Sequence, residues 1–182
     1  VESIEWVNTL KDDENIGKTA EKGKSNFVGP EIEGKKLGVI GLGAIGVLVA
    51  NAANKLGMEV YGYDPFMSVN SAWALSKHVR KAKDMDEIFK TCDYITVHVP
   101  STKDTKGMLN KEKFALMKDG ARLLNFARGD LVVNEDLLEA VETGKLSKYI
   151  TDFAAQEFIG KDNIIVLPHL GASTPESEDN CA

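Results

Sequence analysis

Cysteine is scarce in this sequence of 182 residues, and its scarcity excludes several kinds of protein. The two cysteines, Cys92 and Cys181, lie far apart, belong to no C-x-x-C motif and have no histidine at a metal-ligand spacing. This pattern argues against a disulfide framework or a cysteine-based metal site, and it favours reduced thiols in a cytoplasmic protein. We therefore expect no metal ion and a cytoplasmic location.

Long hydrophobic runs and an excess of basic residues are also absent. No apolar run approaches the roughly 20 residues that a membrane-spanning helix needs, and residues 1–15 lack the basic and then apolar order of a signal peptide. The net charge is −6, with lysines dispersed among carboxylates, whereas nucleic-acid binding requires a concentrated basic surface. We expect neither a membrane nor a nucleic acid as a partner.

The sequence does contain a glycine-rich turn. Residues 36–46 predict a buried strand that runs into this turn, and a helix follows over 47–55. The glycines fit G-x-G-x-x-G, in which one makes a tight turn, one lets the backbone approach a pyrophosphate, and one packs the helix on the strand. Free N–H groups at the helix start then hold the anion. These glycines are Gly41, Gly43 and Gly46.

An acidic residue follows the next predicted strand, residues 58–63. Asp64 comes about 20 residues after the glycine turn, at the spacing where an acidic group hydrogen-bonds the ribose hydroxyls of a dinucleotide. A carboxylate at this point would repel a 2′-phosphate. We therefore predict that the chain binds NAD rather than NADP.

The rest of the sequence alternates predicted strands with predicted helices. The strands cover 36–40, 58–63, 78–80, 93–100, 121–126, 148–153 and 163–167, and the helices cover 1–11, 47–55, 71–75, 84–90, 111–118 and 134–142. Residues 12–35 are polar and rich in glycine and lysine, and we expect a loop there, with a solvated lysine-rich stretch over 18–24. This alternation predicts an α/β fold, a doubly wound parallel sheet of the Rossmann type. Ligands of such sheets bind beyond the carboxyl ends of the strands.

Two side chains at predicted strand ends suit chemistry on a carboxylic acid. Arg128 is one of three arginines, and its planar guanidinium can bind a carboxylate through two hydrogen bonds, although an ordinary surface salt bridge is the alternative. His169 can move a proton near neutral pH, although an ordinary hydrogen-bonded histidine is the alternative. Glu157 lies 12 residues upstream and could orient His169, whereas His98 is expected to line the cofactor pocket.

Five motifs, in order along nearly the whole chain, resemble those of the D-isomer-specific 2-hydroxyacid dehydrogenases. Within that family they are most similar to the branch that oxidises 3-phosphoglycerate. The resemblance implies NAD as cofactor, a small 2-hydroxy or 2-oxo acid as substrate, and a homodimer that pairs through the cofactor domain. The motifs are Gly41 to Gly46, Tyr63-Asp64-Pro65, His98-Val99-Pro100, Asn125-Phe126-Ala127-Arg128-Gly129 and Pro168-His169-Leu170-Gly171.

The resemblance also implies roles for single residues. Arg128 would bind the substrate carboxylate, His169 would be the acid/base, and Glu157 would be its partner. Asp152 is the alternative partner, because Phe158 stands where the family commonly has a proline after the glutamate. Cofactor contacts are expected at Gly41, Gly43, Ala44, Ile45, Gly46, Asp64, His98, Val99, Pro100, Phe126, Ala127, Arg128, Asp152, His169, Gly171 and Ala172.

The family has a second domain that closes over the substrate, and the sequence shows little of it. The chain begins at Val1, within a predicted helix and without an initiating methionine, so we interpret it as a fragment. Residues 1–11 would be the truncated helix from the substrate domain, 12–174 the NAD-binding domain, and 175–182 the start of the helix that leaves it. Alone, such a chain is expected to bind NAD but to turn over little substrate.

Other functions remain open at this point. A protein of the same fold could sense NAD(H) and act through a protein partner, as a corepressor branch of the family does. A dehydrogenase of another 2-hydroxy acid, such as lactate or glycerate, is a second alternative. A Rossmann methyltransferase would suit the glycine turn and Asp64, but it leaves Arg128 and His169 without a role.

Overall fold

The computed structural model describes residues 2–181, without the side chains of residues 2, 178, 180 and 181. Its contacts divide the chain into two units, Val1–Glu31 and Ile32–Ala182. The first unit holds helix α1 (Glu2–Thr9), helix α2 (Ile16–Gly23) and the 3-10 helix η1 (Lys24–Phe27). The rings of Trp6 and Phe27 pack with their centroids 5.2 Å apart, and Gly23 packs against the Trp6 ring.

The predicted loop over residues 12–35 is wrong where α2 and η1 form. Lysine is a good helix former, and the apolar positions Ile16 and Ala20 lie one turn apart. Two apolar residues are too few for a helical period to be seen in the sequence, and the contact of Gly23 with Trp6 comes from tertiary packing. Lys18, Lys22 and Lys24 are exposed, as predicted for a solvated stretch.

The second unit is built on a seven-stranded parallel sheet with strand order β3-β2-β1-β4-β5-β6-β7. This is the order of doubly wound dinucleotide-binding sheets, and it reverses between β1 and β4. The fold class predicted from the sequence is thus confirmed. The strands are β1 (Lys36–Ile40), β2 (Glu59–Tyr63), β3 (Arg80–Lys81), β4 (Tyr94–Val97), β5 (Ala121–Asn125), β6 (Leu146–Thr151) and β7 (Ile164–Val166).

The carboxyl ends of the six longer strands are in register. Ile40 pairs with both Tyr63 and Val97, and the last residues of the remaining strands pair in the same way across the sheet. The residues that follow these strands therefore emerge along one edge. This edge is where the predicted site residues lie.

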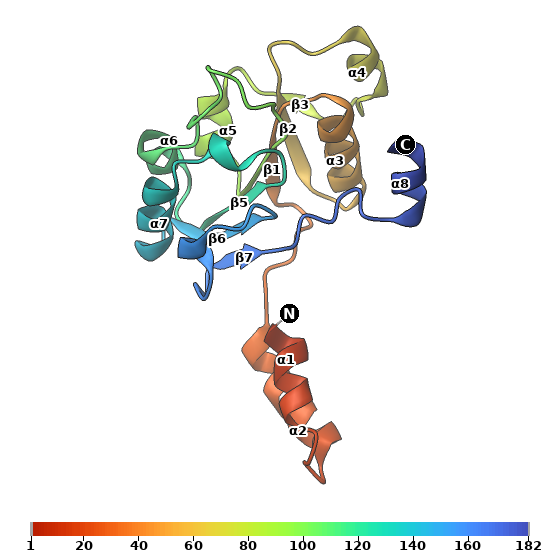
Figure 1. The fold of residues 1–182 in the computed structure, drawn as a ribbon, viewed down its shortest axis with the longest axis vertical. Helices are drawn as coiled ribbons and strands as arrows, with labels where there is room; N and C mark the ends of the chain where they lie inside the picture. Colours follow the sequence, from red (N-terminus) through yellow and green to blue (C-terminus); the bar gives the residue numbers. More distant parts are fainter. Residues whose placement is uncertain (1, 182) are drawn as a thin grey trace. The chain divides into compact units, whose positions relative to one another are not determined.

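Helices cover both faces of this sheet, with α3 on one side and α5, α6 and α7 on the other (Figure 1). The larger hydrophobic core lies under α5, α6 and α7 and includes Phe89, Phe114 and Leu137, all buried. A smaller core lies under α3 and includes Val47 and Ala50. The helices are α3 (Ala44–Lys55), α4 (Val69–Ala74), α5 (Met85–Thr91), α6 (Lys111–Leu116), α7 (Asn134–Glu142) and α8 (Pro175–Cys181), with 3-10 turns η2 (Gly129–Leu131) and η3 (Gln156–Phe158).

The bounds of some elements differ from those predicted. Helix α3 begins at Ala44 rather than at residue 47, so the third glycine of the motif belongs to its first turn. Strand β6 runs from Leu146 rather than from residue 148. Asp84 caps α5 by accepting a hydrogen bond from the Glu87 N–H at 2.9 Å, as its place before an acidic first turn suggests.

Cys92 is a free, buried thiol at the end of α5. Burial raises its pKa to about 12, so it remains protonated at neutral pH. The side chain of Cys181 lies outside the described residues. In the part of the chain that the structure describes, no helix is long and apolar enough to cross a membrane.

Candidate active site

The three glycines of the turn after β1 differ in how much space surrounds their backbone. Gly41 has a φ of +92°, and a Cβ there would lie 2.6 Å from the His98 carbonyl oxygen, so the turn requires glycine. A Cβ on Gly46 would overlap the Gly41 carbonyl oxygen, which is how α3 packs closely on the turn. A Cβ on Gly43 would meet nothing within 4 Å. The space in front of Gly43 is therefore open to a ligand.

This open space lies at the N-terminus of α3, a helix of 12 residues. The first N–H groups of a helix have no partner within it, and together with the helix dipole they favour an anion. Ala44 and Ile45 are the first two residues of α3, and both are exposed. The arrangement suits a pyrophosphate, as the motif predicts.

Asp64, the residue after β2, is joined directly to the glycine turn. Its Oδ2 accepts a hydrogen bond from the Leu42 N–H at 2.8 Å, and its Oδ1 accepts one from the Phe66 N–H at 2.8 Å. A carboxylate has about four lone-pair positions, so both oxygens can still accept hydrogen bonds from ribose hydroxyls. Asp64 borders two hollows of about 450 and 590 Å³.

The residues after β4 form another wall of this site. The His98 N–H donates a hydrogen bond to the Ile40 carbonyl oxygen at 2.7 Å, and its Nε2 lies 3.0 Å from the Thr96 hydroxyl oxygen. Burial lowers the pKa of His98, so its ring is neutral at neutral pH. A Cβ on Gly41 would lie 3.0 Å from Val99 Cγ1, while Pro100 is exposed. His98 thus packs against the glycine turn and is poorly suited to proton transfer.

The loop after β5 carries Arg128. The Arg128 side chain is exposed, and its Nη1 donates a hydrogen bond to the Ala127 carbonyl oxygen at 2.6 Å. Phe126 is partly exposed beside it. The next residue, Gly129, lies against Phe153, because a Cβ on Gly129 would be 3.2 Å from Phe153 Cβ.

His169 lies beside Asp152 in the structure. Its Nδ1 is 2.9 Å from Asp152 Oδ2, and its ring packs against that of Phe153 with centroids 5.4 Å apart. The His169 side chain is 61% exposed, whereas that of Asp152 is only 11% exposed. Phe153 therefore packs between the loop that carries Arg128 and the His169 ring.

Glu157 does not contact His169. Its Oε1 accepts a hydrogen bond from Asn134 Nδ2 at 2.9 Å. The pKa of Glu157 is lowered by hydrogen bonds from its own backbone N–H and from Asn134. Of the two carboxylates considered for His169, the structure brings Asp152 to the ring, and it places Glu157 at the start of α7. Gly171 and Ala172 are exposed in the segment after His169.

Asp152 also has an oxygen without a partner. Oδ1 is buried and accepts no hydrogen bond within the described part of the chain. A buried carboxylate oxygen in this state is costly, and a hydrogen-bond donor on a ligand would relieve that cost. This observation fits a cofactor with an amide group near Asp152.

Sequence reasoning missed two residues that shape this part of the site. Phe153 contacts both Gly129 and His169, and its place just after β6 is a signal that could have identified it. Asn134 holds the Glu157 carboxylate through a hydrogen bond, but nothing in the local sequence marks it for this role.

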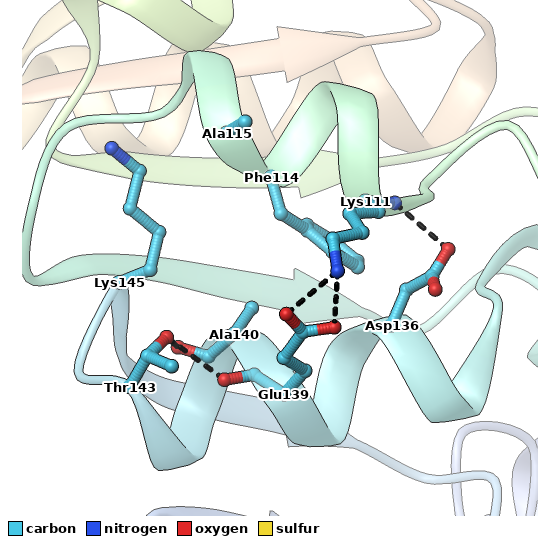
Figure 2. A pocket seen from close by; sticks show the side chains of 8 residues that line it. All are labelled: Lys111, Phe114, Ala115, Asp136, Glu139, Ala140, Thr143 and Lys145. Carbon is cyan, nitrogen blue, oxygen red and sulfur yellow. Dashed lines mark hydrogen bonds and ion pairs between the residues drawn. The ribbon is translucent and has the colours of Figure 1, made fainter.

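Another hollow, of about 300 Å³, lies between α6 and α7 (Figure 2). Lys111 Nζ donates to both carboxylate oxygens of Glu139 at 2.7 Å, and the Lys111 N–H donates to Asp136 at 2.8 Å. Lys145 Nζ pairs with Asp119, which lies outside the lining, at 2.8 Å. None of the predicted site residues lines it. The contacts of Lys111 join α6 to α7.

A doubly wound sheet, a glycine-rich turn before a helix, an acid after the second strand and a histidine–carboxylate pair are together typical of the cofactor domain of a nicotinamide-dependent oxidoreductase. Residues 5–171 match the family model for the NAD-binding domain of D-isomer specific 2-hydroxyacid dehydrogenases. The chain belongs to this family, and its cofactor is NAD.

Individual relatives and solved structures are similar to this chain as well. The chain is 40% identical over 171 residues to D-3-phosphoglycerate dehydrogenase of Bacillus subtilis, covering 91% of this chain and 32% of that protein. It is 39% identical over 165 residues to the enzyme of Synechocystis, covering 87% of this chain and 29% of that protein. D-lactate dehydrogenase from Aquifex aeolicus, solved with NAD and lactic acid, superposes with a TM-score of 0.74 and 31% identity, over 89% of this chain and 56% of that one. The chain thus spans about a third of the length of the two D-3-phosphoglycerate dehydrogenases.

Proposed function

We propose that this chain is the cofactor domain of an enzyme that oxidises a D-2-hydroxy acid with NAD, and that the substrate is 3-phosphoglycerate. The product would be 3-phosphohydroxypyruvate. The observation that carries the proposal is the pairing of His169 with Asp152, next to the loop that presents Arg128. The substrate is proposed from the similarity to D-3-phosphoglycerate dehydrogenases, at 37–40% identity.

The residues present fit the cofactor. The open space at Gly43 and the N-terminus of α3 would hold the pyrophosphate, and Asp64 would bind the ribose. Asp152 Oδ1, buried and without a partner, would accept a hydrogen bond from the nicotinamide amide. When bound, NAD⁺ supplies the acceptor for a hydride.

The chain's own residues would handle the substrate carboxylate and the proton. Arg128 would bind the carboxylate of the 2-hydroxy acid through two hydrogen bonds. The neutral His169 would accept the proton of the C2 hydroxyl as the hydride leaves C2, so that the alcohol becomes a carbonyl. Asp152 would stabilise the imidazolium that forms and hold the ring in place. In the reverse direction, protonated His169 would return the proton to the carbonyl oxygen.

Turnover by the full-length protein tests the proposal. We expect NAD-dependent oxidation of 3-phosphoglycerate to exceed that of lactate and glycerate, and we expect His169→Ala to lower kcat by roughly 10²- to 10⁴-fold. NADH affinity, measured by calorimetry, should change little. The matched control is His78→Ala, since His78 is exposed and precedes β3, at the edge of the sheet opposite to β7 and His169. Near-normal turnover by His169→Ala would refute the assignment, and NADH binding without turnover of any acid would favour the sensing alternative.

Two isosteric variants test which carboxylate is the hydrogen-bond partner of His169. We expect Asp152→Asn to lower kcat more than Glu157→Gln, because only Asp152 lies at hydrogen-bond distance from the ring. The reverse order would mean that Glu157 leaves Asn134 in the working enzyme.

The homodimer is also part of this proposal, and sedimentation at twice the chain mass of 19.8 kDa would support it.

A further inference from the structure

Asn125, the last residue of β5, is a fully buried polar side chain beneath the Arg128 loop. Its amide uses all four of its hydrogen-bonding positions. Nδ2 donates to the Arg128 carbonyl oxygen at 2.8 Å and to the Tyr149 hydroxyl at 3.4 Å, while Oδ1 accepts from the Ala127 N–H at 3.2 Å and the Arg128 N–H at 3.4 Å. A primary amide has two donor hydrogens and two acceptor lone pairs, so no further partner can be added.

These bonds hold the backbone of Arg128 from both sides. Three of them go to the loop, and two of those three go to Arg128 itself, at its N–H and its carbonyl oxygen. The guanidinium is exposed and is bonded to the Ala127 carbonyl oxygen. The position from which this side chain reaches a substrate is therefore set mainly by Asn125.

Tyr149 in turn holds Asn125. It lies on β6, the neighbouring strand, and is 1% exposed. Burial raises the pKa of its hydroxyl, while hydrogen bonds with Thr151 and Asn125 act in the opposite direction, so the group stays a neutral phenol. Its ring also packs edge-on against Phe158, next to Glu157, with centroids 5.7 Å apart.

We propose that Asn125 is a positioning residue that places Arg128 for the substrate carboxylate, and that the Tyr149 hydroxyl fixes the Asn125 amide. The proposal rests on the proposed function, because it needs Arg128 to bind the acid. A buried amide with four satisfied bonds is rigid, and losing one partner leaves a buried polar group without a bond. Asn125 thus acts on the substrate only through Arg128.

The test is a double-mutant cycle on the KM for the 2-hydroxy acid in the full-length protein. Asn125→Asp keeps the size and the acceptor oxygen but removes the donor to the Arg128 carbonyl, so we expect KM to rise roughly tenfold. In an Arg128→Ala background, the same change should have no further effect on KM, since residues that act through one another are not additive. A residue with a merely structural role would lower the melting temperature without this dependence on Arg128.

Tyr149→Phe removes only the hydroxyl and repeats the cycle if Asn125→Asp fails to fold. Its control is Tyr94→Phe, which removes the same hydroxyl from the first residue of β4, two strands away from β6, and should leave KM unchanged. An unchanged KM in Asn125→Asp, or equal effects of that change with and without Arg128, would overturn this inference. If Arg128→Ala itself leaves KM unchanged, then the proposed function fails at Arg128, which is a separate result.

Discussion

Replacing two glycines of the same turn by alanine, one at a time, should separate an effect on stability from an effect on cofactor binding. A Cβ on Gly46 would overlap the Gly41 carbonyl oxygen, whereas a Cβ on Gly43 would meet nothing within 4 Å. Gly43 also has a φ of −73° and a ψ of −163°, which alanine adopts readily. The first change should therefore damage the protein itself, and the second should damage only what binds in front of it.

The magnitudes follow from these contacts. Overpacking at Gly46 should cost about 1–3 kcal/mol, which lowers the melting temperature of a domain of this size by about 2–12 °C. At Gly43, the loss of a good helix-capping residue is offset by the lower entropy of the unfolded chain, so stability should change by less than about 1 kcal/mol. A methyl group in the pyrophosphate space should weaken NADH roughly 5- to 150-fold.

Thermal unfolding and calorimetric titration with NADH measure the two effects on the same samples. Gly29→Ala serves as the control, because a Cβ there also meets nothing within 4 Å and the residue lies in the other unit. Wild-type NADH affinity in Gly43→Ala would refute the placement of the pyrophosphate. A fall in melting temperature as large as that of Gly46→Ala would refute the claim that the space in front of Gly43 is open.

Two further outcomes are expected. Asp64→Ala should weaken NADH and narrow the difference between NADH and NADPH in calorimetry, because the carboxylate that would repel a 2′-phosphate is gone; equal binding of NADPH by the unchanged chain would contradict this. Asp93→Asn should lessen the loss of stability in acid. Burial opposes the effect, but the hydrogen bonds from Lys118 at 2.6 Å and from the Lys36 N–H at 2.9 Å lower the pKa of Asp93 below its ordinary 3.8. Its contribution to stability is present above pH 3.8 and is lost as the pH falls through the lower folded value. Unfolding titrations of both proteins from pH 5 downwards check this prediction. The same loss of stability in acid in both proteins would contradict it.

Much of the fold could be predicted because its signals are local. Strands, helices and their order follow from apolar runs, caps and turns of a few residues each, and the second unit carries all of those predicted for it with modest shifts in their bounds. Because the strands are parallel, their carboxyl ends lie at one edge of the sheet, and this places Gly43, Asp64 and Arg128 along that edge. Helix α2 was not predicted because only two apolar residues, Ile16 and Ala20, indicate it in the sequence. The packing of Gly23 against the Trp6 ring joins residues that are distant in the chain.

By itself, the sequence determined which residue types stand after each strand, and with them the dinucleotide turn, the acid at Asp64 and the two chemical groups, Arg128 and His169. The tertiary structure decided which groups meet. Asp152 rather than Glu157 reaches His169, because the path of the loop after β6 leaves Glu157 against Asn134. The support of the Arg128 loop was likewise invisible in the sequence, since Asn125 and Tyr149 come together only when their strands pair. Side-chain hydrogen bonds depend on distances of a few tenths of an ångström between segments far apart in the chain, and only packing sets those distances.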